Sequence, residues 1–121
     1  MKALFDTNIL VDYLNGVGAA RDELGLYRTR LVSLVSWMEV MIGCHDDTEQ
    51  AAARRFLDAF EVVPVDAAVA ERAVVLRRGN RIRLPDAIIQ ASAEQRNALL
   101  VTRNTRDFPA DQPGVRVPYE V

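Results

Sequence analysis

Short apolar runs alternate along this chain with segments whose apolar side chains recur at helical spacing. Each run is too short for a helix, and together the runs cover residues 3–5, 31–35, 61–65 and 98–102. Strands that alternate with helices in this way predict an α/β protein in which crossover helices join parallel strands. We therefore expect a three-layer α/β/α sandwich around a parallel sheet of about four or five strands, with residues 115–117 as the last strand.

The helices expected between these strands have recognisable start signals. A helix is predicted over residues 19–27. Ser36 and Glu39 have the spacing of a capping box, in which the glutamate reaches back to the serine amide. Thr48 and Asp66 precede further helical patterns and are predicted to cap them.

The length and composition of the chain favour a single domain over residues 1–121. Half of the 121 residues are hydrophobic, which is enough for a core that needs no disulfide or metal to fold. The single cysteine, Cys44, cannot form an internal disulfide and suits a reducing compartment. No apolar run is long enough to cross a bilayer, and the start lacks the pattern of a signal peptide. We expect a cytoplasmic protein that does not contact the membrane.

The charge balance argues against broad binding of nucleic acid through a strongly basic surface, because the formal net charge is −2. Acids that gather around bound cations would weaken this argument, since the remaining surface is then more basic than the count suggests. All 15 basic residues except Lys2 are arginines. Arginine binds phosphate in bidentate fashion, although an arginine bias can also reflect a GC-rich genome.

Four acids lie at or near the ends of the expected strands and the starts of the expected helices: Asp6, Glu39, Asp86 and Asp107. Taken singly, each has an explanation as a cap or a turn residue, and either Asp6 or Asn8 would cap the first helix. The carboxyl ends of parallel strands meet at one edge of a sheet, so these acids can converge although they are far apart in sequence. Clustered carboxylates repel one another, and Mg²⁺ or Mn²⁺ bound among them would relieve the repulsion.

Several motifs occur together and in a recognisable order along most of the chain. They are Phe5-Asp6-Thr7-Asn8-Ile9-Leu10, Glu39 in its helix, Leu84-Pro85-Asp86-Ala87, and Val101-Thr102-Arg103-Asn104-Thr105-Arg106-Asp107-Phe108. In this combination the chain resembles a PIN-domain ribonuclease, and most closely the VapC type, the toxin of a type II toxin–antitoxin pair.

The resemblance implies a role for each matching residue. Asp6, Glu39, Asp86 and Asp107 become the catalytic and metal-binding acids, while Thr7, Asn8, Thr102 and Asn104 become their polar support. Some relatives carry the later acid at the position of Asn104, so Asn104 and Asp107 are alternatives for the fourth place. Hydrolysis of RNA phosphodiester bonds with Mg²⁺ or Mn²⁺ is the implied reaction.

The resemblance also implies partners. The substrate would be tRNA or ribosomal RNA, cleaved so that translation is inhibited, and the active chain would be a homodimer held in check by a small cognate antitoxin. An antitoxin arginine could enter the acidic cleft. The antitoxin helix could pack on apolar residues of the early helices, for which the candidates are Tyr13, Leu14, Leu24, Tyr27, Trp37 and Met41, although each of these also suits an ordinary core.

A basic segment precedes Leu84-Pro85-Asp86, where Pro85 suits the first turn of a helix. Its position beside an expected site acid makes it a candidate RNA-binding loop that contacts phosphates, and the alternative is a solvated surface turn. The arginines concerned are Arg77, Arg78, Arg81 and Arg83.

Other enzyme classes with an acid after the first strand fit less well. A haloacid-dehalogenase-type phosphotransferase needs a second aspartate where this chain has Asn8, and a receiver domain needs a lysine after a late strand. There is no glycine-rich phosphate loop. The remaining alternative is an inactive PIN-like module that binds RNA or a protein, with the acids serving only as caps.

Overall fold

A five-stranded parallel sheet forms the centre of the protein, whose computed structural model describes residues 1–120. The strand order is β3-β2-β1-β4-β5, and every neighbouring pair is parallel. This confirms the α/β class and the parallel sheet predicted from the alternating runs. The strands are β1 (Lys2–Phe5), β2 (Thr29–Ser33), β3 (Glu61–Val63), β4 (Leu99–Val101) and β5 (Val115–Arg116).

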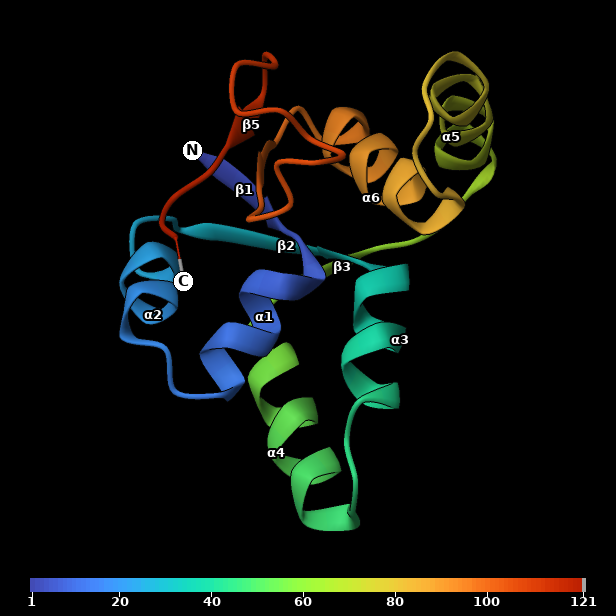
Figure 1. Ribbon diagram of the computed structural model, residues 1–121. Helices are drawn as coiled ribbons and strands as arrows, with labels where there is room; N and C mark the ends of the chain where they lie inside the picture. Colours follow the sequence, from blue (N-terminus) through green and yellow to red (C-terminus); the bar gives the residue numbers. More distant parts are fainter. Residues whose placement is uncertain (121) are drawn as a thin grey trace.

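Helices cover both faces of the sheet (Figure 1). On one face lie α1 (Thr7–Leu14), α2 (Gly18–Leu24), α3 (Leu34–Ile42) and α4 (Asp47–Leu57), and on the other lie α5 (Ala67–Gly79) and α6 (Leu84–Gln95). The three layers therefore match the expected sandwich. No helix within the described residues is both long and apolar enough to span a membrane.

Each face of the sheet buries its own hydrophobic core. Successive residues of β1 point to opposite faces, so Leu4 packs with α5 and α6 while Phe5 packs beneath α1 to α4. The Phe5 ring makes edge-on contacts with Tyr27 and Phe60, at centroid distances of 5.7 and 6.0 Å. Because β1 is central and buried on both sides, its carboxyl end is held firmly where the first acid follows.

Several predicted helix ends are wrong by a few residues. The helix predicted over residues 19–27 ends at Leu24, because the chain turns at Gly25, and Tyr27 is buried in the core beyond it. The N-cap of α4 is Asp46 rather than Thr48, and its carboxylate accepts a hydrogen bond from the Glu49 amide at 2.8 Å. Aspartate caps a helix at least as well as threonine, so the upstream acid sets the start.

The predicted capping box is also wrong. Ser33 ends β2 and caps α3 directly, with its hydroxyl oxygen accepting the Val35 amide hydrogen at 3.2 Å. The helix thus starts at Leu34, and Ser36 and Glu39 both lie inside it. Their spacing of three then places them on one face of the helix rather than at its end.

Other expected ends are confirmed. The Asp66 carboxylate accepts the Val69 amide hydrogen at 2.9 Å at the start of α5, and Pro85 lies in the first turn of α6. In contrast to the predicted basic loop, α5 continues to Gly79, so Arg77 and Arg78 belong to its last turn. Positive side chains are favourable there because the carbonyl end of a helix is partially negative.

Candidate active site

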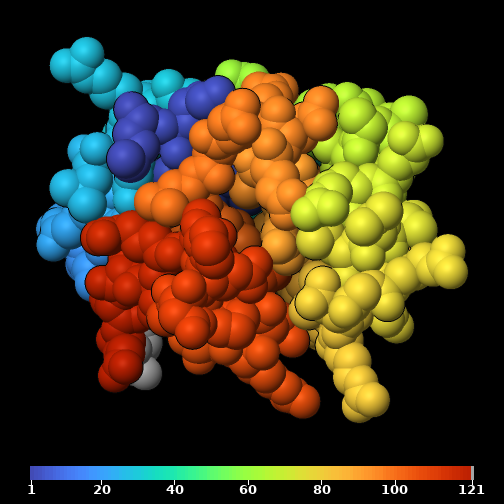
Figure 2. Space-filling model, turned by 90° about the horizontal axis from the view of Figure 1, so that it is seen from above, coloured from blue at the N-terminus to red at the C-terminus, as the bar shows by residue number. Residues whose placement is uncertain are grey.

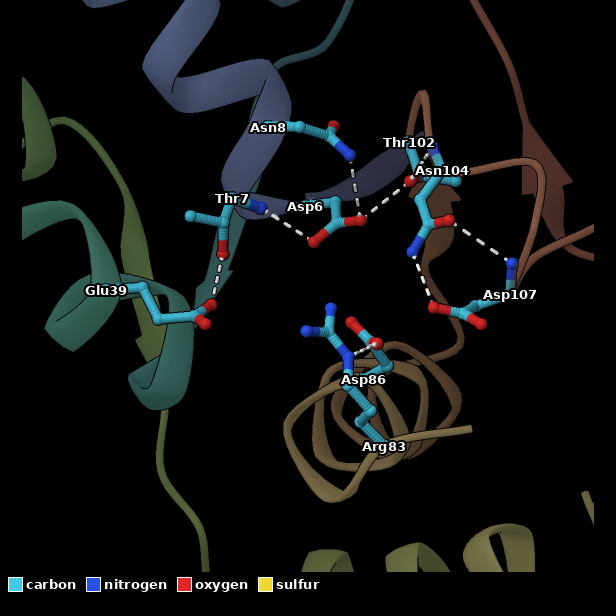
Figure 3. Close-up of polar contacts among 9 residues, drawn as sticks. All are labelled: Asp6, Thr7, Asn8, Glu39, Arg83, Asp86, Thr102, Asn104 and Asp107. Atoms are coloured by element: carbon cyan, nitrogen blue, oxygen red, sulfur yellow. Dashed lines mark hydrogen bonds and ion pairs between the residues drawn. The ribbon is translucent and has the colours of Figure 1, made fainter. Parts of the chain in front are cut away.

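The first acid, Asp6, directly follows β1 and is the N-cap of α1. It is therefore both a helix cap and one of the acids at the edge of the sheet. It is only 4% exposed, and one carboxylate oxygen accepts the Thr7 amide hydrogen at 2.7 Å. The other accepts from the Thr102 hydroxyl at 2.7 Å and from the Asn8 amide group at 3.3 Å. These bonds fix the carboxylate at the edge of the sheet (Figure 3).

The loop after β4 supports Asp6 from the neighbouring strand. Thr102 is fully buried, and its hydroxyl oxygen accepts the Asn104 amide hydrogen at 2.9 Å while the hydroxyl donates to Asp6. The Asn104 side chain in turn donates to the Asp107 carboxylate at 2.9 Å and accepts the Asp107 amide hydrogen at 3.2 Å. Asn104 therefore links Thr102, which supports Asp6, to Asp107.

The Glu39 side chain reaches the site from α3. The Thr7 hydroxyl donates to the Glu39 carboxylate at 2.7 Å and lies 2.9 Å from the hydroxyl of Ser36, which is fully buried. Ser36 is a contributor that the sequence analysis missed, because its spacing from Glu39 was interpreted as a cap. The available signal was a small polar residue, on the same helix face as Glu39, in a mainly apolar helix.

Asp86 lies opposite Asp6, in the first turn of α6, and is 5% exposed. Burial raises the pKa of Asp86 to about 6, and the nearby carboxylates of Asp6 and Asp107 add to the rise. Burial also raises the pKa of Asp6, even though the hydrogen bonds from Thr102 and Thr7 favour its charged form. The two acids thus share a crowded, negatively charged region.

A cleft of about 310 Å³ opens between these side chains. The structure brings Asp6, Glu39 and Asp86 into its lining, together with Thr7, Asn8 and Asn104, whereas Asp107 lines the adjoining groove. Figure 3 shows the Arg83 guanidinium pointing into the space that the three acids face, and its Nε donates to Asp86 at 3.3 Å. This arginine is a partial counter-charge on the site.

The donor set suits a hard divalent cation, because it consists of carboxylate and amide oxygens in a region of excess negative charge. Among residues 1–120, however, no three acidic, histidine or cysteine side chains form a ready ligand set for one ion. A cation such as Mg²⁺ would therefore be held by one or two of these carboxylates together with water molecules. The exposed side chain of Arg83 lies among these acids and would have to move aside for the cation.

The predicted RNA-binding arginines separate into two groups. Arg81 and Arg83 line the groove that adjoins the acidic cleft, whereas Arg77 and Arg78 are exposed on α5 and line neither that groove nor the cleft. Arg106 also lines the groove and was missed, although it belongs to the polar turn recognised after the fourth strand.

A partly buried ion pair in the wall of the cleft was not predicted either. Arg103 donates to both carboxylate oxygens of Asp12, at 2.6 and 3.0 Å, and its backbone amide donates to Asn8 at 3.2 Å. The Tyr119 hydroxyl donates to the same Asp12 at 2.9 Å. This cluster attaches the loop after β4 and the end of the chain to α1, and the sequence offers no local pattern that would reveal it.

The comparisons with known proteins agree with this fold. The PIN domain matches residues 3–110, and the chain belongs to the PIN-domain family. It is 36% identical over 114 residues to ribonuclease VapC10 of Mycobacterium tuberculosis, covering 88% of this chain and 85% of the relative. It is also 29% identical over 119 residues to the tRNA(fMet)-specific endonuclease VapC of Shigella flexneri, covering 89% and 90%.

Solved structures of toxin–antitoxin complexes share the whole architecture. A chain of the Klebsiella pneumoniae toxin–antitoxin complex has a TM-score of 0.92 and 42% identity, covering 98% of this chain and 99% of that one. A chain of the DNA-bound VapBC2 complex of Rickettsia felis has a TM-score of 0.80 and 25% identity, covering 96% of each. The resemblance to VapC-type PIN domains is confirmed.

Proposed function

We propose that this chain is a metal-dependent endoribonuclease and the toxin of a VapBC-type pair, acting on tRNA or ribosomal RNA to inhibit translation. The observation that carries the proposal is the pair of buried acids, Asp6 and Asp86, which face each other across a cleft that Glu39 closes on a third side. Membership of the PIN-domain family and the ribonuclease names of the curated relatives support it. RNA substrates would place the protein in the cytoplasm.

In this proposal the carboxylates of Asp6, Glu39, Asp86 and Asp107 hold Mg²⁺ or Mn²⁺, with Thr7, Asn8, Thr102 and Asn104 as polar support. An ion bound there would supply an activated water and stabilise the leaving oxygen of the phosphodiester. Thr102 and the Thr7 amide keep Asp6 in one orientation, and the Thr7 hydroxyl does the same for Glu39. Asn104 holds Asp107, so the fourth acid and its amide neighbour act as a unit.

The arginines beside the cleft would bind the RNA backbone. We restrict this role to Arg81 and Arg83 among the predicted arginines and add Arg106, because these three line the groove that adjoins the acids. Each presents a planar fork that matches a phosphate.

An apolar groove supports the proposed antitoxin. It has a volume of about 430 Å³ between α1, α3 and α4, and it meets the acidic cleft at Val11 and Glu39. Of the residues suggested for such a groove, Leu14 lines it, whereas Tyr27 and Leu24 are buried in the core. The proposed homodimer has candidate contacts on α3, where Met38 is 43% and Ile42 is 82% exposed.

The test is cleavage of a structured RNA by protein dialysed free of metal, with Mg²⁺ or Mn²⁺ added back. Cleavage should require the added ion and should be lost in Asp6→Asn and Asp86→Asn, each of which removes a carboxylate charge from the cleft. The matched control is Asp58→Asn, which makes the same change at an exposed position directly after α4 and outside the cleft. Full cleavage in excess EDTA would refute metal dependence, and no cleavage with either ion would favour the inactive binding module.

A further inference from the structure

Two grooves continue from the acidic cleft along the seam between the segment before α6 and the loop after β4. The first, of about 430 Å³, shares Arg83 and Asn104 with the cleft. The second, of about 320 Å³, shares Arg81, Arg106 and Asp107 with the first. The three hollows therefore adjoin one another, and we call them together the channel. Two segments form the sides of the channel, which we call its two banks: the segment before α6 and the loop after β4. Figure 2 shows them close together, the first in gold and the second in orange to red.

The chemistry of this channel changes with distance from the acids. The first groove carries arginines, and among residues 1–120 neither Arg81 nor Arg106 forms an ion pair. The second groove adds side-chain amides, of which Gln90 and Gln112 are half-buried. Positive charge suits phosphates, and amides offer both a donor and an acceptor to the edge of a base.

Both banks of the channel are fixed to the protein core. Ile82, 7% exposed, anchors the segment between Arg81 and Arg83, and Phe108, fully buried, anchors the loop that carries Arg106. The two side chains belong to the same hydrophobic core, on the face of the sheet that α5 and α6 cover. A ligand that binds between the banks would therefore meet a surface that is already in place, which lowers the entropy cost of binding.

We propose that this channel binds the nucleotides that flank the scissile phosphate of a single-stranded RNA segment. Arg81 and Arg106 each contact a backbone phosphate, and Gln90 and Gln112 hydrogen-bond to the edge of a flanking base, so this end of the channel contributes to the choice of cleavage site. The inference rests on the proposed ribonuclease function. Single-stranded RNA is the fitting substrate because its bases are free to turn outward and present their edges to side chains.

The first experiment measures RNA binding without cleavage. In an Asp6→Asn background, a short labelled single-stranded RNA is titrated at several salt concentrations. Arg81→Ala with Arg106→Ala should weaken binding about tenfold and make the plot of log affinity against log salt shallower by about 1.4, or about 0.7 for each lost phosphate contact. The matched control is Arg77→Ala with Arg78→Ala, which removes the same charge from the end of α5, outside the channel.

The second experiment determines the sequences at the cut. RNA ends are sequenced after cleavage of a randomised RNA pool by the wild type and by the Gln90→Ala and Gln112→Ala variants. These variants should relax the nucleotide preference at one flanking position, because base contacts carry sequence information and phosphate contacts do not.

The outcomes separate this inference from the proposed function. If the wild type cleaves RNA but the Arg81/Arg106 variant binds it as well as the Arg77/Arg78 control does, the channel proposal is overturned and the ribonuclease assignment stands. If the wild type cleaves nothing with Mn²⁺ but the Arg81/Arg106 variant alone loses RNA binding, the channel is supported and the catalytic proposal fails. An unchanged cut-site preference in both glutamine variants would overturn base recognition at the far end.

Discussion

At the scale of single residues, the acids of the cleft differ in how well the fold compensates their charge. Asp6 accepts hydrogen bonds from Thr7, Asn8 and Thr102, so much of the cost of burying it is offset. Among residues 1–120, the hydrogen-bond donor to the Asp86 carboxylate is the Arg83 side chain, which is 79% exposed and donates at 3.3 Å. Ionised Asp86 therefore has less hydrogen-bond support than ionised Asp6.

This difference predicts a stabilising substitution. Asp86→Asn should raise the free energy of unfolding of metal-free protein at pH 7.5 by about 1 to 2 kcal/mol, less than the full pKa shift implies because water in the cleft screens the charge. The pKa of Asp86 is raised to about 6, so its ionisation costs stability as the pH rises from about 4 to above 6. The gain should consequently vanish near pH 4.

Urea unfolding in EDTA at the two pH values measures this effect. Asp58→Asn provides the control for an exposed aspartate and should change little at either pH. A gain of equal size at pH 4 and pH 7.5, or a loss of stability at pH 7.5, would contradict the electrostatic explanation.

At the scale of secondary-structure elements, the Asp12–Arg103–Tyr119 cluster joins three parts of the chain that the sheet does not hold together. Asp12 belongs to α1, Arg103 to the loop after β4, and Tyr119 to the segment beyond β5. Because Arg103 lies between Thr102 and Asn104, its attachment to α1 restrains the loop that supports Asp6 and Asp107. The cluster should matter for both stability and activity.

The prediction concerns the energetic coupling of Asp12 and Arg103. Arg103→Met leaves Asp12, 7% exposed, with the Tyr119 hydroxyl as its remaining side-chain partner among residues 1–120 and should destabilise the protein by about 2 to 3 kcal/mol. Adding Asp12→Asn should recover part of this loss, because the buried charge that lost its partner is then removed. A double-mutant cycle measured by urea unfolding tests the coupling, and strictly additive effects would show that the two side chains act independently.

The secondary-structure elements also show which features of the fold and the site could be predicted from the sequence. The alternation of strands and helices is a local pattern, so it predicted the sheet and the convergence of Asp6 and Asp86 at its edge. A helix start depends on which of several neighbouring polar side chains accepts a hydrogen bond from a free backbone amide. The sequence offers more than one candidate, and so Ser33 and Asp46 were missed as caps. The Asp12–Arg103 pair joins residues 91 positions apart, and no local pattern encodes such a contact.

At the scale of the whole molecule, the apolar groove and the acidic cleft form one surface. The groove between α1, α3 and α4 ends at Glu39, where the cleft with Asp6 and Asp86 begins. A partner with an apolar helix followed by an arginine would cover both at once, since the helix fits the groove and the arginine pairs with the carboxylates. Such a partner would also compete with the ion for the same acids.

The corresponding prediction is that the small open reading frame adjacent to this gene encodes an inhibitor that occupies this surface. Co-expression should give a stable pair whose metal-dependent cleavage is suppressed until the partner is removed. Ala52→Arg, which places a long charged side chain in the groove, should leave cleavage by the free chain unchanged and weaken inhibition at least tenfold, because a buried charge without a partner costs about 2 kcal/mol or more.

Ala51→Arg is the matched control, because Ala51 is exposed on the same helix and does not line the groove. It should be inhibited as strongly as the wild type. Inhibition that survives Ala52→Arg would place the partner elsewhere on the surface, and a stable pair that cuts RNA as fast as the free chain would contradict occlusion of the cleft. If the groove anchors the partner, the free energy of inhibition comes mainly from apolar contact and the arginine sets its position, so raising the salt concentration should weaken inhibition less than Ala52→Arg does.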